Sequence, residues 1–207
     1  MAKAAFQPNS GETGDCAWTL DANGLLTVSG AGAMENYEGA RTPAPWRAYA
    51  KGVAVAEIES GVTSIGDYAF ANCDYLKDVK IPDSVTRIGK GAFFGCKSLK
   101  SLQIPDSVTQ IEDYAFESSG LTSLPIPERV TEIGRGVFRF CTGLTDLQIP
   151  DRITKIGERA FAFCRNLTGA EIPDSVTEIG PGAFYWCQRM ESLRLSAALA
   201  EIERGAF

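Results

Sequence analysis

Apolar residues recur along this chain at a fixed interval, and a similar pattern of polar residues surrounds each of them. An isoleucine before a proline returns every 22 or 23 residues, at Ile81, Ile104, Ile126, Ile149 and Ile172. A phenylalanine returns with the same period and defines what we call the phenylalanine column: Phe70, Phe93, Phe116, Phe138, Phe161, Phe184 and Phe207. A period of this length is typical of a solenoid, in which each repeat forms one coil of a stacked array.

The pattern within each repeat predicts two short strands and one helical turn. The first strand is indicated by L-x-x-L-x-I-P, as from Leu99 to Pro105, where alternate residues point inward and the proline ends the strand. The second is indicated by V-T-x-I-G, as from Val85 to Gly89. In the following x-x-A-F-x-x-C segment, we interpret the alanine and phenylalanine as inward-facing residues of a helical turn. The expected fold class is therefore an α/β repeat with short parallel strands.

Three regions follow from these patterns. Residues 1–14 are expected to form a flexible leader. Residues 15–52 are expected to form an N-terminal cap, a β-hairpin turning at Asp21–Gly24 followed by a short helix that Pro45 and Trp46 begin. Residues 53–207 are expected to form the solenoid of about seven coils, the last one incomplete. The cap would cover the apolar end of the first coil.

The composition of the chain mainly excludes classes of function. The formal charge is −6 and the 20 Lys and Arg residues are scattered, so we expect no nucleic-acid partner. The chain contains no histidine, which removes the usual general base and the commonest zinc ligand. We therefore predict no enzyme activity, no catalytic residue, no metal and no cofactor. No apolar run reaches the ~18 residues of a transmembrane segment, and the first residues lack a signal peptide.

The cysteines follow the repeat. Cys16 lies in the cap, whereas Cys73, Cys96, Cys141, Cys164 and Cys187 occupy one repeat position. Disulfides between adjacent coils are one interpretation, but parallel inward side chains have poor geometry for the S–S torsion. Buried free thiols that fill a small apolar space are the favoured interpretation.

The pattern LxxLxIPxSVTxIGxxAFxxC resembles the BspA-like class of bacterial leucine-rich repeats, and the lead-in CAWTLDANGLLTVSGAGAM followed by PW resembles the segment that precedes such repeats. This resemblance implies a right-handed leucine-rich repeat solenoid in a secreted or surface-exposed protein, and a protein-binding or adhesion role. Three departures stand out: a repeat one residue short between Phe116 and Leu121, Leu195-Ser196 in place of Ile-Pro, and a chain that stops at Phe207. The last suggests either a truncated fragment or an end covered by a partner, including a second copy.

Solvent-facing positions of the first strand are where a leucine-rich repeat usually presents its binding surface. We call these positions the strand row: Asp78, Lys80, Ser101, Gln103, Ser123, Asp146, Gln148, Glu171 and Arg194. The row is polar and contains no aromatic residue. Both a ligand-binding face and a merely solvated sheet remain open.

A second candidate surface lies just before the repeat cysteine. There the residues Asn72, Gly95 and Ser118 give way to Phe140, Phe163 and Trp186 in successive repeats. Together with Tyr185, the last three form what we call the aromatic stripe, and Phe94 could extend it. Contiguous exposed apolar surface often marks a contact site. The alternative is that these rings pack over the coil corners and shield the core.

The repeat architecture and the absence of histidine favour a protein-protein or adhesin-type interaction module with an unknown protein or glycan ligand. The resemblance implies that it belongs to a bacterial surface or secreted protein. A cytoplasmic location is not excluded by the sequence. The alternative function is a structural spacer within a larger envelope protein.

Overall fold

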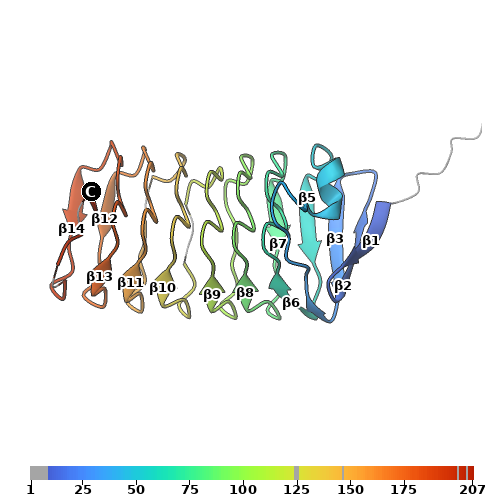
Figure 1. The fold of residues 1–207 in the computed structure, drawn as a ribbon, viewed down its shortest axis with the longest axis horizontal. Helices are drawn as coiled ribbons and strands as arrows, with labels where there is room; N and C mark the ends of the chain where they lie inside the picture. Colours follow the sequence, from blue (N-terminus) through green and yellow to red (C-terminus); the bar gives the residue numbers. More distant parts are fainter. Residues whose placement is uncertain (1–8, 124–125, 146, 200, 204) are drawn as a thin grey trace, which may run out of the picture.

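The chain forms an elongated stack of coils with its cap at one end and its C-terminus at the other (Figure 1). The computed structural model describes residues 9–123, 126–145, 147–199, 201–203 and 205–207. One row of strands consists of β3 (Leu25–Gly30), β5 (Val55–Ile58), β7 (Asp78–Lys80), β12 (Gly169–Glu171) and β14 (Ser192–Arg194). The other consists of β4 (Gly32–Ala33), β6 (Val62–Ile65), β8 (Arg87–Ile88), β9 (Gln110–Ile111), β10 (Glu132–Ile133), β11 (Lys155–Ile156) and β13 (Glu178–Ile179).

Strands pair in parallel from coil to coil, and the register keeps equivalent residues of successive repeats side by side. Ile65 pairs with Ile88 and Ile88 with Ile111, and all three side chains are buried. The second strand of the repeat forms as predicted. The first strand forms at β7, β12 and β14, but around Leu102 the described chain follows the same path without a strand. The solenoid of parallel strands is thus confirmed.

The phenylalanine column runs along the inside of the stack. Successive rings from Phe70 to Phe207 lie 5.2 to 5.7 Å apart between centroids, with interplanar angles of 3 to 15°. Five of these rings, those of Phe70, Phe93, Phe116, Phe161 and Phe184, are among the largest fully buried side chains. Because each ring contacts the one in the next coil, no coil buries its own phenylalanine alone.

The expected α/β class is not confirmed, because the described residues contain no α-helix. Each x-x-A-F-x-x-C segment is instead a corner built of turns. At the first corner the Phe70 N–H donates to the Ala92 carbonyl of the next coil at 2.8 Å, while the Ala71 N–H donates to the Tyr68 carbonyl at 3.1 Å. Alternate N–H groups are thus committed to the neighbouring coil. Tyr68 and Asn72 also have positive φ angles, which a right-handed helix excludes.

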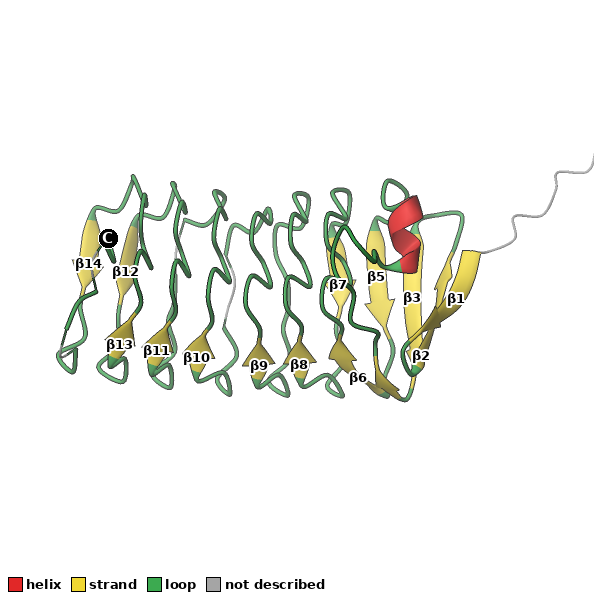
Figure 2. Cartoon of the chain, in the orientation of Figure 1, coloured by secondary structure: helices red, strands yellow, loops and turns green. Residues whose placement is uncertain are grey.

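The cap continues the sheet of the solenoid. β2 (Cys16–Leu20) and β3 form the predicted antiparallel hairpin, and β3 then pairs in parallel with β5. The expected short helix of the cap is not confirmed, because these residues form the 3₁₀ helix η1 (Pro45–Tyr49) instead, shown in red in Figure 2. Within it, the buried Trp46 ring lies 5.8 Å from the Trp18 ring and 5.9 Å from the Phe70 ring. The cap therefore supplies an aromatic ring at the head of the phenylalanine column.

One strand of the cap was not foreseen. β1 (Asn9–Thr13) pairs antiparallel with β2, although these residues fall within the expected flexible leader of residues 1–14. The strand is polar and largely exposed, so its sequence shows no alternation of buried and exposed residues. Backbone pairing at the edge of the hairpin forms it, rather than burial of side chains. Residues 1–8 lie outside the described residues.

All six cysteines are free thiols, as favoured by the sequence, and all except the half-buried Cys187 are buried. We call the five cysteines at the repeat position the cysteine ladder. In it, the Cys96 thiol donates to the Phe70 carbonyl of the preceding coil at 3.1 Å, and the Cys164 thiol donates to the Phe138 carbonyl at 3.1 Å. Burial raises the pKa of the Cys73 and Cys141 thiols to about 12 and that of Cys187 to about 11.

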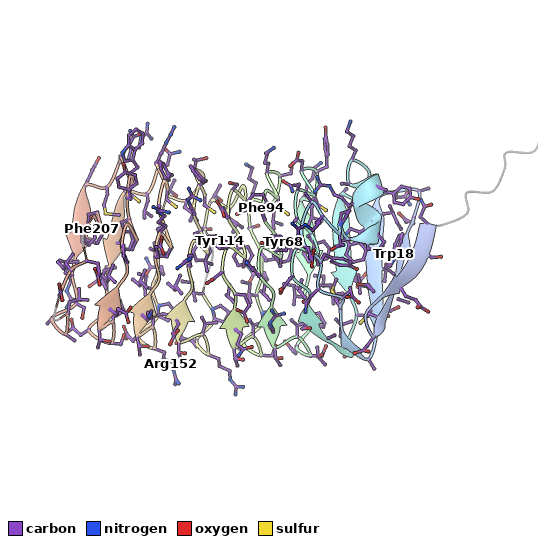
Figure 3. All side chains as sticks on the ribbon, viewed as in Figure 1. Trp18, Tyr68, Phe94, Tyr114, Arg152 and Phe207 are labelled. Atoms are coloured by element: carbon purple, nitrogen blue, oxygen red, sulfur yellow. The ribbon has the colours of Figure 1, made fainter. Side chains whose placement is uncertain are left out.

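Two adjacent phenylalanines separate the effect of the column from that of a corner side chain. Phe93 is fully buried in the column, whereas Phe94 is half-buried. Figure 3 labels the position of Phe94. We predict that Phe93→Ala lowers the free energy of unfolding by about 3 to 5 kcal/mol, because it leaves a cavity between two stacked rings. Phe94→Ala should cost about 1 kcal/mol. Urea denaturation followed by circular dichroism measures both, and equal losses would contradict the column's role.

The ladder thiols should resist alkylation. At pH 8, iodoacetamide should modify few thiols of the folded protein, Cys187 first, and nearly all six after denaturation.

The raised pKa values of the buried thiols also predict how stability depends on pH. The unfolded thiols ionise near 9.0 and the folded ones at higher pH, so the contribution of the thiols to stability should be constant below pH 9 and should fall as pH rises toward 12.

Mass spectrometry of the native protein tests whether the repeat cysteines are free thiols or form disulfides. Disulfides joining Cys141, Cys164 and Cys187 in the native protein would show that the thiol interpretation is wrong.

Candidate interaction surfaces

The strand row lies on the solvent side of the first strands, as the alternation of the repeat requires. Its described members are all exposed: Asp78, Lys80, Ser101, Gln103, Ser123, Gln148, Glu171 and Arg194. Asp146, which we also assigned to the row, lies outside the described residues.

Charged residues of the strand row form ion pairs with residues of adjacent coils. Lys80 Nζ lies 2.6 Å from Glu57 Oε1, and these residues are register partners on β7 and β5. Arg194 Nη1 lies 3.1 Å from Glu171 Oε1 on the neighbouring β12. Gln148, Glu171 and Arg194 are brought together around hollows of about 480 and 470 Å³. The row is therefore a polar surface whose described acidic and basic groups largely neutralise one another.

The aromatic stripe is a continuous cluster of rings at the corners of three coils. Phe140 and Phe163 stack with centroids 4.5 Å apart and planes 16° from parallel. The Phe163 ring contacts Tyr185 at 5.5 Å and Trp186 at 5.8 Å. Exposure increases along the stripe, from the half-buried Phe140 and Phe163 to Tyr185 at 43% and Trp186 at 47%. Phe94 has no ring contact with the stripe among the described residues.

Arginines cover part of this ring surface. The Arg139 guanidinium carbon lies 4.6 Å from the Phe140 centroid, and that of Arg165 lies 5.7 Å from the Trp186 centroid, both within cation-π range. Arg139 is held in place by the Glu117 carboxylate at 3.2 Å. Burial raises the pKa of the Glu117 carboxyl above its usual value, and the nearby Arg139 offsets part of that shift. The stripe therefore combines apolar rings with positive charge.

The backbone beneath the stripe is left-handed. The residue before the repeat cysteine has a positive φ in each repeat, which includes Asn72 at 55° and Gly95 at 70°. These residue types tolerate that region, because glycine has no Cβ and asparagine hydrogen-bonds locally. In the later repeats Phe140 (59°), Phe163 (64°) and Trp186 (60°) take the same conformation. A positive φ is uncommon for such bulky residues and costs ~1 to 2 kcal/mol each.

Large side chains also occur at a second left-handed position of the corner, but there they alternate with glycine from coil to coil. Tyr68 and Tyr114 also have positive φ angles, at 54° and 60°. Each ring lies over a glycine of the next coil, so that a Cβ on Gly91 would come within 2.4 Å of the Tyr68 ring and one on Gly136 within 2.5 Å of the Tyr114 ring. Large and small residues alternate there, which packing explains. The stripe instead places three aromatic residues in succession.

The last described coil exposes further apolar side chains. Leu195 is 36% exposed, Ile202 47% and Phe207 44%. Tyr185, Trp186 and Phe207 line a hollow of about 580 Å³.

Sequence reasoning identified the rings of the stripe but missed Arg139, Arg165 and the left-handed backbone. A signal for the backbone existed in the residues Asn72 and Gly95, which are typical of positive φ and mark the same repeat position. The arginines gave no such signal, because their approach to the rings depends on the path of the corner. The described residues contain no group of three or more acidic or cysteine side chains arranged for a metal. No helix among them is long and apolar enough to span a membrane.

Three solved structures illustrate the likeness of this fold to bacterial proteins. A leucine-rich repeat protein from Bacteroides ovatus superposes with a TM-score of 0.73 at 24% identity, over 96% of this chain and 54% of that one. A T. pallidum leucine-rich repeat protein superposes with a TM-score of 0.68 at 25% identity, over 90% and 84%. The pneumococcal vaccine antigen PcpA superposes with a TM-score of 0.56 at 21% identity, over 96% of this chain and 51% of that one. The chain thus spans about half the length of the first and third proteins.

No curated protein matches the sequence. The family model described as the BspA type leucine-rich repeat region matches in six copies, over residues 52–168 and 109–207. Together these ranges cover most of the chain and coincide with the coils and the phenylalanine column. The chain therefore belongs to the BspA-type leucine-rich repeat family.

Proposed function

We propose that this chain is a protein-interaction module of a bacterial surface or secreted protein, and that the aromatic stripe is its main contact surface. The observation that carries this proposal is the series of aromatic residues in left-handed conformation at Phe140, Phe163 and Trp186. Backbone strain of this kind clusters at functional sites. Asparagine, glycine and serine in the earlier repeats form the same corner, so the fold itself does not require a ring there.

Charge around the stripe favours an acidic partner surface. Within residues 135–142, 158–166 and 181–190 the sequence has five arginines and a single glutamate, although the whole chain has a formal charge of −6. Arg139 is already paired with Glu117, whereas Arg165, which lies over the Trp186 ring, forms no ion pair within the described part of the chain. The edge of the Arg165 guanidinium is therefore available for a carboxylate. Aromatic residues and arginine are also the residue types that dominate interface energetics.

We also propose that the chain lies outside the cytoplasm. Its support is the family itself and the likeness to a pneumococcal vaccine antigen. The proposal assigns no catalytic chemistry to the chain.

A structural spacer is the second candidate, and the strand row favours it. The ion pairs Lys80–Glu57 and Arg194–Glu171 neutralise charges that a binding face would present to a ligand. In this alternative the chain would hold other parts of a larger protein apart.

Self-association through Leu195, Ile202 and Phe207 is a separate alternative, because these side chains are exposed in the last described coil. Light scattering tests it: Phe207→Asp should then convert a dimer to a monomer.

Trp186→Asn tests the stripe with little disturbance of the corner, because it restores the residue type found at Asn72 in the same left-handed position. We predict that it weakens binding to the partner by ~2 kcal/mol or more, as expected for a ring at the centre of an interface. The measurement is a pull-down from host extracellular and bacterial surface extracts, followed by titration of any retained protein.

Gln103→Ala, on the strand row, is the matched control and should retain the same partner. A protein retained by wild type and by this control, but lost with Trp186→Asn, would support the stripe. Equal retention by all three proteins would contradict the role of the stripe, and no specific retention at all would favour the spacer.

A further inference from the structure

A hollow lies where the cap meets the first coil, and the proposed function does not involve it. Its volume is about 710 Å³, within the ~300 to 1,000 Å³ of small-molecule sites. It is lined by the turn between β2 and β3, by the segment from η1 to Gly52, and by the first corner around Asn72 and Tyr75. Figure 2 shows η1 in red at this end of the stack.

Two tyrosines on this hollow have no evident structural role. Tyr49 is 41% exposed and Tyr75 is 53% exposed. Tyr75 occupies a position that other repeats fill with Ser98, Gly143 or Asn166, so the coil does not require a ring there. Among the described residues, neither tyrosine has a ring contact with another aromatic side chain. Both residues line the hollow.

Planar polar groups accompany these rings. Arg47 Nη1 donates to the Ala71 carbonyl, which anchors the guanidinium, and no described carboxylate forms an ion pair with it. Asn72 contributes an amide. Asp74 contributes a carboxylate whose Oδ2 lies 3.5 Å from Lys97 Nζ and whose side chain is 44% exposed. The hollow thus offers both hydrogen-bond donors and acceptors.

Formal charges on the hollow balance. Arg47 and Lys51 oppose Asp21 and Asp74. The Asp21 carboxylate is already engaged in the turn, where Oδ1 accepts from the Asn23 N–H at 2.8 Å and the Leu25 N–H at 2.9 Å. A phosphorylated ligand would require an excess of positive charge, and an apolar ligand would require a lining with fewer charged groups.

We propose that this hollow binds a neutral sugar unit. The electron-rich faces of Tyr49 and Tyr75 suit the polarised C–H groups of a pyranose ring. The Arg47 guanidinium, the Asn72 amide and the Asp74 carboxylate suit its hydroxyl groups, which donate and accept hydrogen bonds. This site is independent of the aromatic stripe, because its lining segments belong to the cap and the first corner, whereas the stripe lies in coils nearer the C-terminus (Figure 1).

The chain contains six tyrosines, which permits a site-resolved test by ¹⁹F NMR of the 3-fluorotyrosine-labelled protein. The probes are the methyl glycosides of glucose, galactose and mannose, and N-acetylglucosamine, each titrated to millimolar concentration. We expect the Tyr49 and Tyr75 signals to shift saturably with at least one sugar, while those of Tyr114 and Tyr185 stay unchanged. Tyr75→Ser, which copies Ser98, should weaken that binding by about tenfold and leave the fold intact.

Arg47→Ala should also weaken binding. Arg152→Ala is its control, since Arg152 lies on the opposite edge of the solenoid (Figure 3). Unchanged Tyr49 and Tyr75 signals with every sugar would overturn the proposal, as would uniform shifts of all tyrosine signals or undiminished affinity in Tyr75→Ser.

Discussion

The stacking of one phenylalanine per coil is the interaction on which the structure depends. Rings from Phe70 to Phe207 lie 5.2 to 5.7 Å apart, and each is covered by its neighbours in the adjacent coils. A coil of 22 or 23 residues is too short to bury such a ring by itself. Folding is therefore a property of the stack, and the cap takes part because Trp46 packs on the first ring.

This constraint leaves the corners as the place where sequence can vary. The backbone of each corner is fixed by N–H groups that donate to the next coil, as from Phe163 to the Tyr185 carbonyl at 2.7 Å. The non-glycine side chains at the left-handed positions are half-buried or exposed and do not belong to the column, so their identity matters less for the stack. At one such position Tyr68 packs over Gly91 of the next coil. At another, Trp186 is exposed, and packing does not explain its presence.

Much of the fold could be predicted because periodicity is a long-range signal that repeats itself. The solenoid, the buried phenylalanines and the β2–β3 hairpin all follow from the spacing of apolar residues or from the Asn23–Gly24 turn. The corner was wrongly expected to be helical, because inward residues three apart fit both a helix and successive turns. β1 escaped prediction because its polar residues carry no burial pattern. The arginines and the hollow at the cap depend on contacts between segments far apart in the sequence.

The central claim is that the aromatic stripe is retained for binding rather than for the fold. The most direct measurement is the free energy of unfolding of the triple variant Phe140→Gly, Phe163→Asn, Trp186→Asn, which restores residue types of the earlier repeats at three left-handed positions. Relief of ~1 to 2 kcal/mol of strain at each position should offset the lost ring contacts. We therefore predict a stability within about 1 kcal/mol of wild type, or above it. A loss of ~4 kcal/mol or more, as for core phenylalanines, would contradict the account and make the stripe part of the core.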